Sequence, residues 1–161
     1  MPAENRAEKV AFQKALAKLQ ADMGIAQRLM SESRNKLRHI KAAIKRSEQP
    51  LGSLAADVKA IEDQLSEVQL AMYGDSVKRR LDMDQPPSPA SRLGSIGWEQ
   101  KYSTATPTKT HRDSYAIAKD EVTAIKANME RIFNNDLRVL EQKLIDSGAP
   151  YTPGRGSENE D

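Results

Sequence analysis

Histidines and carboxylates are the side chains in this sequence that could bind a metal or transfer a proton. The two histidines, His39 and His111, lie in different predicted elements. Neither has a neighbouring His, Cys or carboxylate at the spacing that metal ligands require. The chain contains no cysteine, which excludes disulfides and thiolate metal sites. The sequence therefore predicts no metal site and no cofactor.

Hydrolysis by paired carboxylates needs two acidic side chains that face each other across a cleft. Most acidic residues here fall on polar helix faces, and only Asp82, Asp84 and Glu99 lie in a less regular segment. A Ser-His-Asp set stays open, although no segment resembles a strained nucleophile turn. Gly94 and Gly97 do not predict a phosphate loop, because no strand precedes them and no Lys-Ser/Thr pair follows. We expect no catalytic residue and no cofactor-binding residue in this chain.

A basic run around position 40 could bind nucleic acid. His39 lies within this run, which consists of Arg34, Lys36, Arg38, Lys41, Lys45 and Arg46. Cations also stabilise the carboxyl end of a helix. The next predicted helix carries acidic residues that could pair with them: Asp57, Glu62, Asp63 and Glu67. Nucleic-acid binders usually add stacking aromatics, and none lies in this run, so we favour the structural interpretation over a nucleic-acid partner.

Long amphipathic helices are the elements that must position these side chains. Apolar residues recur at alternating steps of four and three from Phe12 to Ile44, and only Ser33 interrupts them. Two later segments repeat these steps. The pattern predicts helices over about 5–47, 53–73 and 107–147.

The predicted fold class is all-α, an antiparallel three-helix bundle with two long helices and one shorter helix. Residues 1–148 are expected to form a single domain. Residues 149–161 are expected to form an extended and disordered tail, because they are rich in Pro, Gly and acidic residues.

Helices two and three are joined by a linker, 75–106, in which Pro and Gly alternate with large apolar residues. We expect this structured linker to run back along the bundle, anchored by Leu93, Ile96 and Trp98. A short helical turn is expected around 88–93. Trp98 could instead be a platform on which a sugar or base stacks, but a single Trp in a small domain is more often a packing anchor.

The apolar stripe of the third helix slips by one residue around 132–137. Such a stutter locally unwinds a helical seam. The slip could bring Asp136 toward the interior, where it would need a Lys or Arg from another helix. Alternatively, Asp136 is simply solvated, and the sequence leaves both alternatives open.

Composition restricts the class and location of the protein. The chain has 161 residues and a formal net charge of +2, which gives no strong attraction to nucleic acid or membranes. No apolar run is long enough for a secretory signal or a membrane-spanning helix. We therefore expect no membrane partner, and a cytoplasmic location if the chain is free-standing.

The second half of the sequence resembles a known family. The run MYGDSVKRRLDMDQPPSPASRLGSIGW, residues 72–98, is similar to the C-terminal helical region of bacterial sortilin-like, Asp-box-repeat β-propeller proteins. The similarity continues through ATPTKT and SYAIA and ends with DSGAPYTPGR, residues 146–155. These proteins are often labelled glycosyl hydrolases. The propeller repeats are absent here, so the resemblance implies no catalytic residue in this chain.

The resemblance implies a non-catalytic accessory module that packs on the propeller, spaces it or contacts a partner, in a secreted or periplasmic parent protein. Because the second helix is short, we expect a docking surface at Phe12, Leu16, Leu19 and Met23. The linker, the parent's propeller domain, another protein or a second copy could cover it. The alternatives are a free-standing helical adaptor or homo-oligomer, a basic nucleic-acid-binding helical protein and a small hydrolase.

Overall fold

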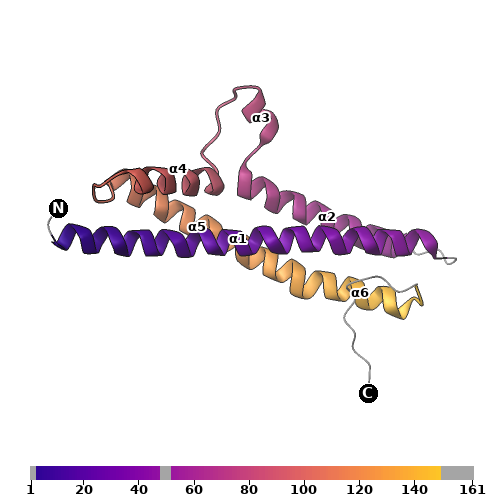
Figure 1. Ribbon diagram of the computed structural model, residues 1–161. Helices are drawn as coiled ribbons and strands as arrows, with labels where there is room; N and C mark the ends of the chain where they lie inside the picture. The colour runs from indigo at the N-terminus through magenta and orange to yellow at the C-terminus, as the bar shows by residue number, and fades with distance from the viewer. Residues whose placement is uncertain (1–2, 48–51, 150–161) are drawn as a thin grey trace, which may run out of the picture. The chain divides into compact units, whose positions relative to one another are not determined.

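The computed structural model describes residues 3–47 and 52–149, and every regular element in these ranges is helical (Figure 1). The all-α prediction is therefore confirmed for the described residues. The predicted tail lies outside them from residue 150 onward. The elements are α1 (Ala3–Arg46), α2 (Gly52–Tyr73), α3 (Ser76–Arg80), α4 (Pro89–Tyr102), α5 (Lys109–Arg131), the π-helical turn η1 (Ile132–Asp136) and α6 (Leu137–Asp146).

The first helix, α1, is unbroken over 44 residues, which corresponds to a length of about 66 Å. Ser33 replaces an apolar residue within the buried stripe and is itself fully buried. Gly24 has open space around its Cβ position and does not interrupt the helix. The buried side chains follow the predicted steps of three and four: Leu16, Leu19, Met23, Ala26, Met30, Ser33, Leu37, Ile40 and Ala43.

The chain divides into two compact units, each built from separate stretches of sequence. The first unit consists of Met1–Ala26 and Glu67–Ala127. The second unit consists of Gln27–Ser66 and Asn128–Asp161. The helices α1, α2 and α5 contribute residues to both units, so each unit is described below by its own contacts.

In the first unit, α4 runs antiparallel to the amino-terminal part of α1. Gln20 Nε2 donates a hydrogen bond to the Leu93 carbonyl at 3.5 Å. Gln13 Nε2 donates to the Gln100 carbonyl at 3.4 Å. The residue numbers fall on one helix as they rise on the other, which is the signature of antiparallel helices. The linker thus returns along α1, as expected.

The helix α4 also corrects the prediction for the linker. We expected only a short helical turn around 88–93, but α4 has fourteen residues and includes Gly94 and Gly97. Each glycine costs about 1 kcal/mol relative to alanine inside a helix. Leu93 and Ile96 offset that cost because they bury one face of α4. Ser88 also caps the helix through its side-chain oxygen, and a proline occupies the first turn.

The helices α1 and α5 of the first unit run parallel. Arg112 on α5 donates to the Glu8 carboxylate on α1. Lys126 donates to Asp22 at 2.6 Å. Both pairs are separated by 104 residues, so the two helices advance together.

The second unit is packed from parts of α1, α2 and α5 together with η1 and α6. Its core includes Leu37, Leu65 and Leu140, which are all at most 2% exposed. Three ion pairs join the helices at their margins: Lys41–Glu62 at 2.8 Å, Lys36–Glu141 at 2.9 Å and Lys143–Asp57 at 2.7 Å. Each of α1, α2 and α6 therefore contacts the other two.

The predicted register slip coincides with η1. The backbone N–H of Leu137 bonds to the carbonyl of Ile132, five residues earlier, and both side chains are fully buried. A π turn holds one residue more than an α turn, so it keeps both apolar residues on the core side. The extra residue also changes the sequence separation between α1 and the residues that pair with it. Lys36 and Glu141 are 105 positions apart, whereas the pairs of the first unit are 104 positions apart.

Asp136 does not take a partner from another helix. Its Oδ2 accepts a hydrogen bond at 2.6 Å from Arg131, which lies five residues earlier in the same run of helix. The carboxylate is partly exposed. The π turn brings these two side chains together because it changes the angular spacing along the helix.

Candidate functional site

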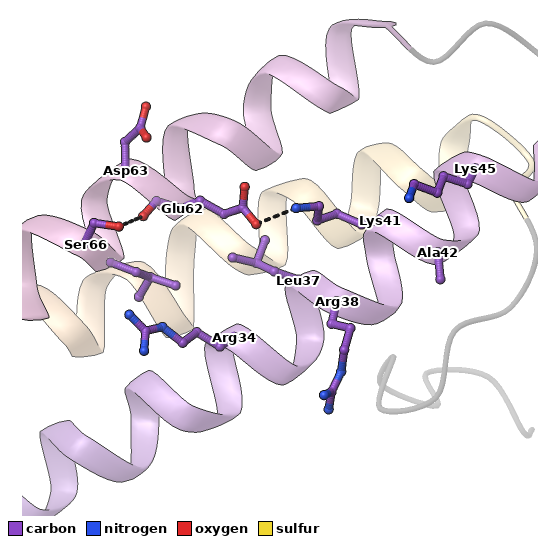
Figure 2. Close-up of a pocket in the computed structure, with 10 residues that line it drawn as sticks. Arg34, Leu37, Arg38, Lys41, Ala42, Lys45, Glu62, Asp63 and Ser66 are labelled. Carbon is purple, nitrogen blue, oxygen red and sulfur yellow. Dashed lines mark hydrogen bonds and ion pairs between the residues drawn. The ribbon is translucent and has the colours of Figure 1, made fainter.

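A groove of about 730 Å³ lies between α1 and α2 of the second unit (Figure 2). Its floor is apolar and its rims are charged. From α1 it is lined by Arg34, Leu37, Arg38, Lys41, Ala42 and Lys45, and from α2 by Glu62, Asp63, Leu65 and Ser66. This groove contains much of the basic run that sequence analysis singled out.

Four cations form the α1 side of the groove. Arg34, Arg38, Lys41 and Lys45 are spaced by four, three and four residues, which places them along one helix face. They extend over about 16 Å of helix. Figure 2 shows Lys41 pointing toward Glu62, whereas Arg38 points away from α2 on the outer rim.

Two carboxylates form the α2 side, and each has a cationic partner. Glu62 accepts from Lys41 at 2.8 Å. Asp63 accepts from Lys59 on its own helix at 2.8 Å. The hydrogen bond and the charge of Asp63 raise the pKa of Lys59 above its ordinary value. The groove therefore retains an excess of positive charge.

The predicted pairing of the basic run with α2 is present at Lys41, which binds Glu62. Asp57 pairs with Lys143 of α6, and Asp63 pairs within α2. Lys36 turns to α6, where it binds Glu141 and lies 5.1 Å from the centre of the Phe133 ring. Arg38 donates to the neutral side chain of Asn35.

In the first unit, polar groups surround the buried ring of His111, which sequence reasoning did not connect to Glu99. His111 Nδ1 accepts from the backbone N–H of Thr108 at 3.2 Å, so the ring proton resides on Nε2, which faces the Glu99 carboxylate. Gln100 Nε2 also lies 3.0 Å from Nδ1. Both ring nitrogens are engaged, so the cluster clamps the end of α4 to the start of α5.

Three carboxylates were singled out in the sequence as loosely placed, and the structure puts one of them in this clamp. Glu99 is committed to His111, while Asp82 and Asp84 are exposed between α3 and α4. Among residues 3–47 and 52–149, no three His, Cys, Asp or Glu side chains are grouped as metal ligands. No signal in the sequence predicted the contact between Glu99 and His111, because it depends on how the 103–108 connection closes.

Trp98 is 67% exposed and does not anchor the linker. Leu93 and Ile96 are buried against the first unit, but Trp98 follows Ile96 by two residues and so lies on the opposite side of α4. Its ring packs on that of Tyr102, with 4.6 Å between the ring centroids. The anchor prediction for Trp98 failed because the segment was not expected to be helical.

The expected docking surface on α1 is covered by the chain itself. Leu16, Leu19 and Met23 are each 4% exposed. Phe12 is partly buried, and its ring lies 5.4 Å from that of Tyr115 on α5. Of the covers considered for this surface, the linker is the one observed: its helix α4 packs along this part of α1 together with α5, so Leu16, Leu19 and Met23 form no open docking surface.

Comparison with known proteins adds no family assignment. No family model, curated protein or solved structure matches this chain. In the described part of the chain, no helix combines the length and the apolar character of a membrane span.

Proposed function

We propose that this chain is a non-catalytic helical accessory module that serves packing, spacing or contact with a partner protein. The proposal rests on the contrast between two surfaces of α1, one apolar and one charged. The apolar stripe of α1 is buried by the chain's own helices, whereas the α1–α2 groove presents charged side chains to solvent. Such a molecule is suited to hold a fixed shape and to contact a partner through polar groups.

The proposed parent is a sortilin-like β-propeller protein, secreted or periplasmic. The support is the resemblance of the blocks between residues 72 and 155, and the propeller would carry any glycosyl hydrolase activity. We extend the proposal to an antiparallel three-helix bundle. The antiparallel α1–α4 contacts and the parallel α1–α5 contacts within the first unit are compatible with it.

The absence of catalysis is likewise part of the proposal. Both ring nitrogens of His111 are engaged in the clamp, which leaves neither free to act as a base without opening the cluster. An adaptor that assembles through Phe12, Leu16, Leu19 and Met23 is disfavoured because these residues are covered.

The length of the native polypeptide tests the proposal. An antibody raised against this chain, followed by mass spectrometry of the captured product, should detect a polypeptide longer than 161 residues that contains Asp-box repeats. A native product that lacks such repeats would contradict the parent protein. Hydrolysis of a panel of aryl glycosides by the purified chain, retained at constant rate through repurification, would contradict the non-catalytic role.

A further inference from the structure

We infer that the α1–α2 groove of the second unit binds an acidic helix of a partner protein. The inference rests on the proposed role in partner contact and specifies its surface and its chemistry. It starts from an imbalance of charge along α1. Between Gln27 and Arg46, α1 carries seven Lys or Arg residues and one Glu.

Contacts inside the protein account for part of this charge. Arg28 faces Glu32 at 3.9 Å, Lys36 binds Glu141, and Lys41 binds Glu62. Glu32 lies on α1 itself, Glu141 on α6 and Glu62 on α2. Arg38 and Lys45 of the groove take part in none of these ion pairs.

The helix dipole does not account for the rest. Its effect is confined to the last turn of a helix, which explains Lys45 and Arg46. Arg38 lies two turns earlier, and its recorded partner is the neutral amide of Asn35. Within the described residues, Lys45 has no ion pair. Neither intramolecular pairing nor the dipole therefore explains why Arg38 belongs to this row.

The geometry favours a long anion over a small one. The cations are spread over about 16 Å of α1, and the groove of about 730 Å³ is open to solvent. A single small anion could reach only one or two of them. A helix with Asp or Glu at steps of four, three and four residues would advance along α1 by the same rise and bring carboxylates to Arg38 and Lys45, one turn either side of the Lys41–Glu62 pair.

The composition of the groove favours a polypeptide over nucleic acid. No aromatic side chain lines it, so unpaired bases would find nothing to stack on. Glu62 and Asp63 on the α2 side would repel a phosphate backbone. The arginines suit carboxylates because a guanidinium can bind one with two parallel hydrogen bonds. An acidic helix can avoid the α2 side by presenting neutral residues there.

Binding of a designed peptide tests this inference. The probe is a fluorescein-labelled 18-residue helix of Ala and Gln that carries Glu at positions 4, 8, 11 and 15, measured by anisotropy at about 50 mM NaCl, where exposed charges are weakly screened. We expect saturable binding to the full chain. A peptide of the same composition with its glutamates distributed around the helix should bind at least about fivefold more weakly, because fewer carboxylates can meet the row at once.

Two matched double variants locate the site. Arg38→Glu with Lys45→Glu should weaken binding by about tenfold or more. Lys14→Glu with Lys18→Glu makes the same change of net charge on the first-unit part of α1 and should change affinity by no more than about twofold. Arg34 is left unchanged because it interacts within the chain. If the glutamate variant of the groove loses helicity by circular dichroism, Arg38→Gln with Lys45→Gln replaces it.

Three results would overturn the inference. Equal weakening by both double variants would show attraction to net charge and no defined site. Tighter binding of a 20-base-pair DNA duplex than of the peptide would indicate a nucleic-acid surface. Absence of peptide binding at low salt would remove the site altogether. None of these results depends on the length of the native polypeptide, so the parent protein is tested separately.

Discussion

The two units build on the same helix, α1, but present different surfaces. Nine of the eleven exposed large apolar side chains among the described residues lie in the first unit, including Trp98, Tyr102 and Leu81. The second unit instead carries the cationic row and the charged groove. In both units the apolar stripe of α1 is buried. Both units therefore bury the same apolar stripe of α1, and they differ in the side chains that they expose.

The units also differ in how a second helix is held against α1. In the first unit, glutamine side chains of α1 donate to backbone carbonyls of α4. In the second unit, a lysine of α1 pairs with a carboxylate of α2. Contacts to backbone carbonyls require a close approach of two helices, and a Cβ added at Gly97 of α4 would lie only 2.9 Å from Gln20 Nε2 of α1.

The largest expected difference between the units concerns single-residue deletions. Deleting Asn135 from η1 should restore α-helical spacing, because Leu137 would then follow Ile132 by four residues. Deleting the exposed Thr123 from α5 should rotate the rest of the helix by about 100° and expose its apolar stripe. We expect a change within about 1 kcal/mol for the first deletion and loss of cooperative unfolding for the second.

Thermal unfolding followed by circular dichroism measures both deletions. Asn135 and Thr123 are exposed, so neither deletion removes a buried side chain. Equal destabilisation would mean that η1 is not a place where the helix accommodates one extra residue.

The second prediction compares the polar contacts of the units. His111→Leu should lower the free energy of unfolding by about 1–3 kcal/mol, because it leaves the Thr108 N–H and the Gln100 amide without an acceptor. Lys41→Met should cost less than about 1 kcal/mol, because both partners of the Lys41–Glu62 pair are more than 40% exposed. Urea unfolding at neutral pH distinguishes these values, and the reverse order would contradict the role of His111 as a clamp.

The third prediction tests whether α4 is as well formed as α1. Gly94→Ala should stabilise the chain by about 0.5–1 kcal/mol, since alanine is the better helix former. Nothing lies within 4 Å of the Cβ position of Gly94 or of Gly24 in α1, so Gly24→Ala is a matched control. A gain for Gly24→Ala with none for Gly94→Ala would show that α4 is not a stable helix.

The smallest effect is expected at the start of α3. Backbone N–H groups of Lys78 and Val77 hold the pKa of Asp75 below its ordinary value of 3.8. Because the folded pKa is depressed, the capping contribution is present above pH 3.8 and is lost as the pH falls through the folded pKa. NMR titration of the Val77 amide should follow this loss, and Asp75→Asn should abolish the titration. An unshifted Asp75 would contradict the cap.

Much of the fold was predictable because it depends on local periodicity. Alternating steps of three and four located α1 and its buried face, and the slip around 132–137 located η1. The sequence could not predict that Trp98 is exposed. That exposure follows from the helical backbone of α4, which forms despite its two glycines. Nor could it link Glu99 to His111, since they lie on two helices whose approach depends on the 103–108 connection.

By itself, then, the sequence determined an all-helical chain, the seam of α1 and the concentration of positive charge between Gln27 and Arg46, because spacing and composition are properties of the chain alone. Only the tertiary structure decided that α4 and α5 cover Phe12, Leu16, Leu19 and Met23. It also decided that the cations of α1 line a groove against α2. The physical reason is that burial and ion pairing depend on which segments meet in space, and helical periodicity does not specify that.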